Sequence, residues 1–192
     1  MNKFLVIFIY CLISPIFASV NNNQIINNLM VAVKVGDIDK TITILASNKE
    51  NKEKSLDTLD MINIRDREGF TALMHASRYG QSEITAEFLN RGANPNLDNR
   101  GITALMLATM YGRDNIVIQL LSKEANPNLV NGQYNLTALM YAARHGHIKI
   151  VKILLANGAN FSVKDINGNT ALALAKKYGH INIASILEAV AK

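Results

Sequence analysis

The sequence predicts an all-α solenoid built from stacked antiparallel helix pairs. Three observations predict it: a motif beginning Thr-Ala-Leu recurs at near-constant spacing, glycines recur at fixed offsets after it, and apolar residues with helical spacing follow each glycine. The motif copies are 71–74, 103–106, 137–140 and 170–173, at spacings of 32, 34 and 33 residues. Because one helix pair cannot bury its own apolar face, such units must stack on their neighbours.

Each element of the repeat has a local physical reason. Thr71 and its equivalents can cap the start of a first helix through the hydroxyl group. Gly80 and its equivalents can end that helix in a left-handed conformation, where a Cβ atom would cost energy. A second helix then runs antiparallel to the first, and a Gly-Ala-Asn element closes the unit at Gly92 and again at Gly158.

This pattern resembles the ankyrin repeat, whose hallmark is Thr-Pro-Leu-His-x-Ala within a period of about 33 residues. The resemblance covers Ile62 to about Leu187. The family's Pro is Ala in every copy, and its His is Met in three copies and Ala in the fourth. The imidazole hydrogen bonds to neighbouring loops are then missing, which predicts a less rigid stack. Glu124 replaces the second-helix Gly, so we expect segment 123–125 to be strained or frayed.

The chain is expected to contain a leader, a capping unit and a repeat domain. Residues 1–18 have the pattern of a secretory signal peptide, because Lys3 precedes an apolar run at 4–13 that is too short to span about 30 Å of hydrocarbon. Cleavage is expected near Ala18; an uncleaved membrane anchor and a buried N-terminal helix are the alternatives. A divergent N-terminal capping repeat is expected at 24–60, with a charged insertion at 49–60. Residues 61–192 are expected to hold four repeats, at about 66–97, 98–131, 132–164 and 165–192.

Motif content argues against an enzyme. Cys11, the single cysteine, lies inside the expected signal peptide. The histidines lack the i, i+4 spacing of a helical metal site, and no clustered carboxylates accompany them. His145 and His147, two residues apart across a glycine, are expected to diverge. His147 and His180 stand where ankyrin repeats commonly carry a structural histidine. We therefore predict no catalytic residue, no metal site and no cofactor.

The resemblance implies that a partner contacts the hairpin tips and the exposed end of each first helix, on the concave face of the solenoid. The tip residues expected to contact it are Arg67, Phe70, Arg100, Ile102 and Tyr134. The helix-end residues are Arg78, Tyr79, Met110, Tyr111, Arg144, His145, Lys177 and Tyr178. Tyr and Arg are enriched among interface hot spots. The alternative is that the Tyr column only packs against neighbouring hairpins.

The sequence thus predicts an exported protein of a bacterial-type cell that binds another protein as a monomer, without catalysis, in the periplasm or after secretion. A secreted effector that binds a host protein is a sub-case. The net charge of +5 makes a nucleic-acid or membrane-surface binder the alternative. Nucleic acid is disfavoured because the chain has no Lys/Arg cluster of the nucleic-acid-binding type. Membrane contact is expected only through an uncleaved signal.

Overall fold

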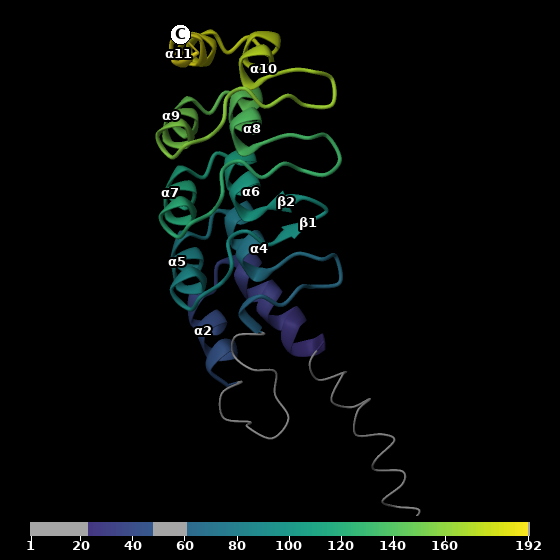
Figure 1. Cartoon of the computed structure of the whole chain (residues 1–192). Coiled ribbons are helices and arrows are strands. Elements are labelled where there is room, and N and C mark those ends of the chain that lie inside the picture. Colours follow the sequence, from purple (N-terminus) through teal and green to yellow (C-terminus); the bar gives the residue numbers. More distant parts are fainter. Residues whose placement is uncertain (1–22, 48–60, 192) are drawn as a thin grey trace, which may run out of the picture.

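The computed structural model describes residues 23–47 and 61–191, which form helix pairs stacked along one axis (Figure 1). The pairs are a helix over 23–35 with α2 (Ile38–Ser47), α4 (Ala72–Tyr79) with α5 (Ser82–Asn90), α6 (Ala104–Met110) with α7 (Asp114–Ser122), α8 (Ala138–His145) with α9 (Ile148–Ala156), and α10 (Ala171–Lys177) with α11 (Ile181–Val190). The predicted all-α solenoid is confirmed. The expected signal peptide at 1–18 and insertion at 49–60 lie outside the described residues.

From α4 onward, each first helix packs against its own second helix and against the first helices of the adjacent pairs. Small residues make this close approach possible, since the same repeat position holds a completely buried alanine in each of these first helices: Ala76, Ala108, Ala142 and Ala175. The aliphatic side chains of the second helices cover this row, as Ile150, Val151 and Leu154 do in α9. The core is therefore one continuous layer that runs through all the units.

The hairpin loops project from one side of the stack (Figure 1). In the loop before α6, β1 (Asp98–Asn99) pairs antiparallel with β2 (Ile102–Thr103), with Asp98 opposite Thr103. The threonine caps predicted at the end of each loop are present. The hydroxyl of Thr71 accepts a hydrogen bond from the N–H of Met74 at 3.3 Å, and Thr103, Thr137 and Thr170 make the equivalent bond at the same distance. Such a cap stabilises a helix by about 1 kcal/mol.

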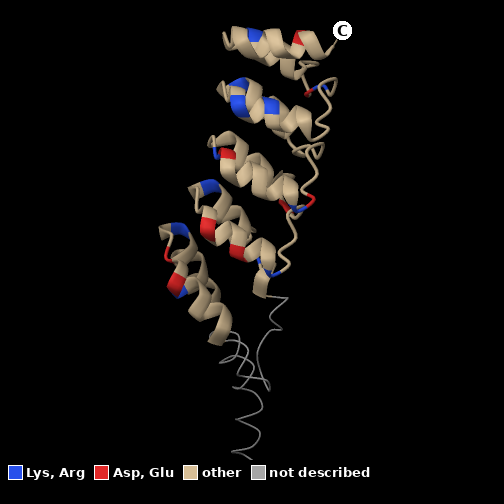
Figure 2. Ribbon diagram, turned by 90° about the vertical axis from the view of Figure 1, so that its left-hand side faces the viewer, with Lys and Arg blue, Asp and Glu red and all other residues tan. Residues whose placement is uncertain are grey.

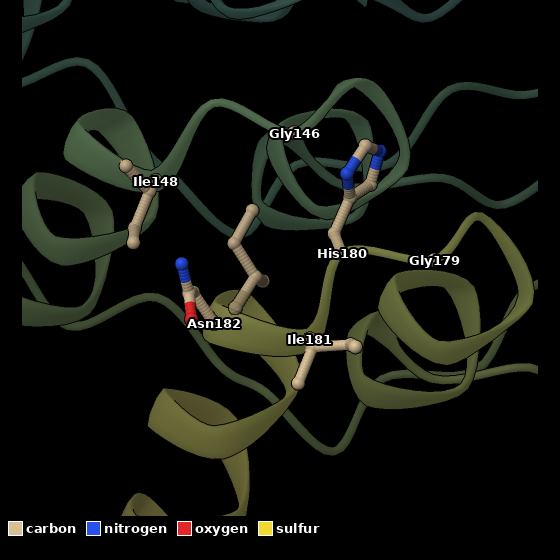
Figure 3. A pocket seen from close by; sticks show the side chains of 7 residues that line it. Gly146, Ile148, Gly179, His180, Ile181 and Asn182 are labelled. Carbon is tan, nitrogen blue, oxygen red and sulfur yellow. The ribbon is translucent and has the colours of Figure 1, made fainter.

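The glycine that ends each first helix also makes room for the next unit. Gly146 has the predicted left-handed conformation, with φ 78°, and a Cβ atom built on it would lie 2.7 Å from Cε1 of His180. Figure 3 shows this imidazole beside Gly146. Equivalent contacts join Gly36 to Gln81, Gly80 to Arg113 and Gly112 to His147. Gly179 has the same conformation, with φ 77°, and apart from its chain neighbours no described residue has an atom within 4 Å of its Cβ position.

Asparagines join the loops that follow the second helices. Oδ1 of Asn96 accepts a hydrogen bond from the N–H of Asn126 at 2.7 Å, and its Nδ2 donates to the carbonyl of Glu124 at 3.0 Å. Asn128 makes the same two contacts one unit later. Glu124 itself has φ 62°, a conformation that costs a residue with a Cβ about 1–2 kcal/mol. The strain expected at 123–125 is therefore confirmed.

His75, in α4, is buried. Its side chain is 3% exposed, and its Nε2 lies 2.7 Å from Oδ2 of Asp66 in the preceding hairpin. Its Nδ1 is buried and has no hydrogen-bond partner among the described residues. Burial lowers the pKa of His75, and this outweighs the hydrogen bond to Asp66, which raises it. Burial raises the pKa of Asp66. The hydrogen bonds from His75 and from the N–H groups of Phe70 and Glu68 lower this pKa by more than burial raises it, so the net shift is downward from 3.8.

Replacing Gly146 by Ala should destabilise the fold more than replacing Gly179 by Ala. Both substitutions force a Cβ into a left-handed conformation, at a cost of about 1–2 kcal/mol, but only the first also pushes against His180. The free energies of unfolding, measured by urea denaturation of the full chain, should differ accordingly. Equal losses would show that the contact between Gly146 and His180 contributes nothing to the stack.

Acid should destabilise the wild-type fold more than a His75→Gln variant. Since the pKa of His75 is depressed in the folded state, its contribution to stability is complete above 6.5 and is lost as pH falls through the lower folded value. Gln keeps an amide donor toward Asp66 but does not titrate. The difference in unfolding free energy between the two proteins should shrink as pH falls below 6.5 and before Asp66 is protonated. Parallel pH profiles would contradict this.

Candidate functional site

The helix-end residues predicted to contact a partner form two columns at the carboxyl ends of successive first helices. We call this set the basic–aromatic stripe: Arg78, Tyr79, Met110, Tyr111, Arg144, His145, Lys177 and Tyr178. Each residue is in the last turn of α4, α6, α8 or α10 or directly follows it. Because these four helices pack in a row, the structure brings equivalent side chains of adjacent repeats together.

The cations of the stripe lie over tyrosine rings, and two of these contacts cross from one repeat to the next. The guanidinium carbon of Arg78 lies 5.7 Å from the ring centroid of Tyr79 and 5.5 Å from that of Tyr111. Arg144 lies 5.3 Å from the ring of Tyr178 in the following repeat, and Nζ of Lys177 lies 6.0 Å from the same ring. Exposed cation–π contacts contribute about 0.5–1 kcal/mol each. The sequence predicted the columns but not this pairing between repeats.

The tyrosines of the stripe remain accessible. Tyr79, Tyr111 and Tyr178 are 44%, 43% and 42% exposed. Half-exposed rings of this kind present both an apolar surface and a hydroxyl group to a partner. Their described cation neighbours, together with the contact of Tyr79 with the His75 ring at 6.3 Å, hold the rings in place.

His145 occupies the aromatic column between Tyr111 and Tyr178. Its ring centroid lies 6.0 Å from that of His147, with only 11° between the ring planes. The expected divergence of these two side chains is therefore wrong, because the left-handed turn at Gly146 brings the second ring back alongside the first. Burial lowers the pKa of His145, and the nearby His147, Arg144 and His180 lower it further. At neutral pH His145 is thus an uncharged aromatic member of the stripe.

His147 and His180 contact the backbone of two stripe residues. Nε2 of His147 lies 3.4 Å from the carbonyl oxygen of Met110, and Nε2 of His180 lies 3.1 Å from that of Arg144. In each case the histidine contacts a carbonyl group at the carboxyl end of the first helix in the preceding repeat. The last carbonyl groups of a helix have no hydrogen-bond partner within the helix itself. The structural function expected of both histidines is confirmed.

The five predicted tip residues differ in accessibility. Arg67, Arg100 and Tyr134 are exposed, with 46% of the tyrosine accessible. Phe70 and Ile102 are half-buried and pack against the core, so they offer less surface to a partner. Arg100 has a left-handed conformation, with φ 53°, at the turn of the hairpin. Neighbouring tips are joined, since the amide of Asn99 donates to the carbonyl of Glu68 at 2.9 Å.

The described residues also form a cleft beside Gly146 and Gly179 and a charged face on the second helices. The cleft in Figure 3 is lined by glycine backbone, isoleucines, Asn182 and His180, whose Nε2 already contacts a carbonyl, so this lining holds no paired acid and base. The face of the second helices carries mixed charges (Figure 2), with carboxylates on α5 and lysines on α9.

Within 23–47 and 61–191, no three His, Cys, Asp or Glu side chains are grouped as a metal ion would need. No helix in the same ranges is long and apolar enough to cross a bilayer.

Comparison with known proteins agrees with the repeat architecture. The family model for ankyrin repeats (three copies) matches residues 29–131 and 118–190, which together span most of the chain. A search of curated proteins found no match. Ankyrin repeats commonly mediate protein–protein interaction, and the family is typically a non-catalytic scaffold. By its helix pairs, its capped and glycine-ended first helices and this match, the chain belongs to the ankyrin-repeat family.

Proposed function

We propose that the chain is an exported, non-catalytic module that binds another protein through the basic–aromatic stripe and the hairpin tips of its concave face. The observation that carries the proposal is the pairing of Arg78 with Tyr111 and of Arg144 with Tyr178 across adjacent repeats. Tyr and Arg dominate interface hot spots. Since these side chains are already held against one another, a partner would lose less free energy in ordering them.

The scaffold beneath the stripe supports a preformed surface. The units α4–α5, α6–α7 and α8–α9 are joined by three kinds of contact: the packed first helices, the side chains that lie against glycines, and the asparagine hydrogen bonds of the loops. The tips add further links, such as the bond from the amide of Asn135 to the carbonyl of Lys164 at 2.7 Å. We propose that a monomer with this construction binds its partner by mass action on this preformed surface.

Export is proposed from the signal-like pattern at 1–18, with the periplasm or the exterior as destination. A secreted effector that binds a host protein is one form of this proposal. The net charge of +5 favours a nucleic-acid or membrane-surface binder as the second candidate. That candidate predicts a steep loss of binding with salt and no preference among proteins.

A triple variant, Arg78→Ala/Tyr111→Ala/Arg144→Ala, should lose its protein partner while keeping its far-UV helicity. Hot-spot truncations of this kind reduce affinity by about 30-fold or more. The measurement is capture of proteins by the full chain from cell-envelope and host lysates, read by mass spectrometry. The matched control is Ile118→Ala/Lys123→Ala/Lys152→Ala, which removes one exposed apolar side chain and two exposed cations from α7, its carboxyl end and α9. Loss of the same partner in both variants would remove the stripe from consideration.

Expression of the chain in a bacterial cell should yield a processed protein outside the cytoplasm. Cleavage near Ala18 would remove the apolar run and leave the repeats intact, so the intact mass of the exported protein should be lower by about the mass of residues 1–18. An Ala18→Glu variant, which places a charge where a small residue is needed, should accumulate unprocessed. Full-length wild-type protein confined to the cytoplasmic fraction would refute export.

A further inference from the structure

The cations of the stripe have donors that no described residue uses. Arg78 and Arg144 form no hydrogen bond or ion pair by their side chains within the described part of the chain, and Lys177 forms no ion pair there. Stacking engages the flat face of a guanidinium group and leaves its N–H donors at the edge. Those donors match the two oxygens of a carboxylate. The stripe therefore presents fixed positive groups with their hydrogen-bonding edges open.

The carboxylates at the hairpin tips are mostly engaged within their own turns. Asp66 binds His75 and two N–H groups, and Asp98 accepts a bond from the N–H of Gly101 at 2.6 Å. Asp165 accepts bonds from the N–H groups that follow it, and its pKa is lowered by hydrogen bonds and by Lys177, although burial raises it. Glu68 is the exception among the described tip carboxylates. These carboxylates keep their negative charge, but among the described residues none of them forms an ion pair with Arg78, Arg144 or Lys177.

The repeat sets the distances between these cations. The first helices that carry them, α4, α6, α8 and α10, pack in direct succession. Packed helices lie about 9 Å apart, so Arg144 stands about 18 Å along the stack from Arg78, and Lys177 about 27 Å. Met110 occupies the intermediate place at about 9 Å. A segment in the polyproline II conformation advances about 3.1 Å per residue with about three residues per turn, so three residues span about one repeat and every third side chain lies on the same face of the segment.

We propose that the stripe binds an extended acidic segment of a partner protein, laid along the stack. In the polyproline II conformation, acidic residues at roughly positions i, i+6 and i+9 face Arg78, Arg144 and Lys177, and an apolar residue at roughly i+3 faces Met110. The tyrosines pack beside the backbone of the segment between these points. This inference rests on the proposed function and specifies the chemistry of the partner.

The test uses the full chain and two synthetic peptides of about 12 residues with one composition. The registered peptide carries Glu at positions 1, 7 and 10 and Leu at 4 in a Ser/Gln background, and the permuted peptide carries the three Glu residues consecutively. Fluorescence anisotropy should show the registered peptide binding at least about fivefold more tightly, since each aligned exposed ion pair contributes up to about fivefold. Its binding should weaken as salt is added.

Charge reversal provides the decisive variant. Arg78→Glu/Arg144→Glu should reject the registered peptide and bind a version that carries Lys at positions 1 and 7. The control Lys123→Glu/Lys152→Glu makes the same change in net charge on α9 and at the end of α7, and should bind the original peptide within about twofold of wild type. Far-UV circular dichroism checks that both variants keep the fold.

Equal binding of the two peptides, equal loss in the two charge-reversal variants, or no binding of the registered peptide would each overturn the acidic-segment proposal. Stronger binding of single-stranded DNA or of anionic lipid vesicles, lost in the stripe variant, would also overturn it, because the partner would then be another class of molecule. Failure of the proposed function is distinguishable: it would be seen as unchanged partner capture by the Arg78→Ala/Tyr111→Ala/Arg144→Ala variant.

Discussion

The close packing of one first helix on the next is the constraint on which the rest of the structure depends. No helix pair has a core of its own, so the free energy of folding comes from the surfaces between units. The completely buried alanines set how near the units come. That distance in turn places Arg78 within reach of Tyr111, and Arg144 within reach of Tyr178. The candidate binding surface is thus a by-product of the spacing that stabilises the fold.

Much of the fold could be predicted because its signals are local. Threonine caps, glycine helix ends and helical apolar spacing each depend on a few adjacent residues, and four copies in phase reinforce one another. Contacts between repeats could not be read in this way. Asn96 and His75 are ordinary polar residues in the sequence, and only the superposition of units shows that one ties two loops together and the other is buried against Asp66.

The candidate site was predictable as columns of residues but not as a set of interactions. The repeat length of about 33 residues predicted which side chains occupy equivalent positions in successive repeats. It also predicted that Met110 interrupts the column of basic residues. The period did not show that each arginine lies over the tyrosine of the following unit, nor that His145 and His147 stack, because side-chain directions depend on the left-handed turn between them. For Phe70 and Ile102 the prediction itself was too simple. The family position suggested that both side chains are exposed, but both are half-buried and pack against the core.

The contact between the glycine that ends each first helix and a side chain of the next repeat has a consequence for the evolution of such a chain. Four junctions place a side chain from the following unit against this glycine, and the occupants are Gln81, Arg113, His147 and His180. The groups are an amide, a guanidinium and two imidazoles, but in each case an atom at the ε position lies nearest to the glycine. The junction therefore depends on where that atom lies more than on the chemical type of the group. Neighbouring repeats can diverge at this position, or be duplicated and lost as whole units, without a matching change elsewhere in the stack.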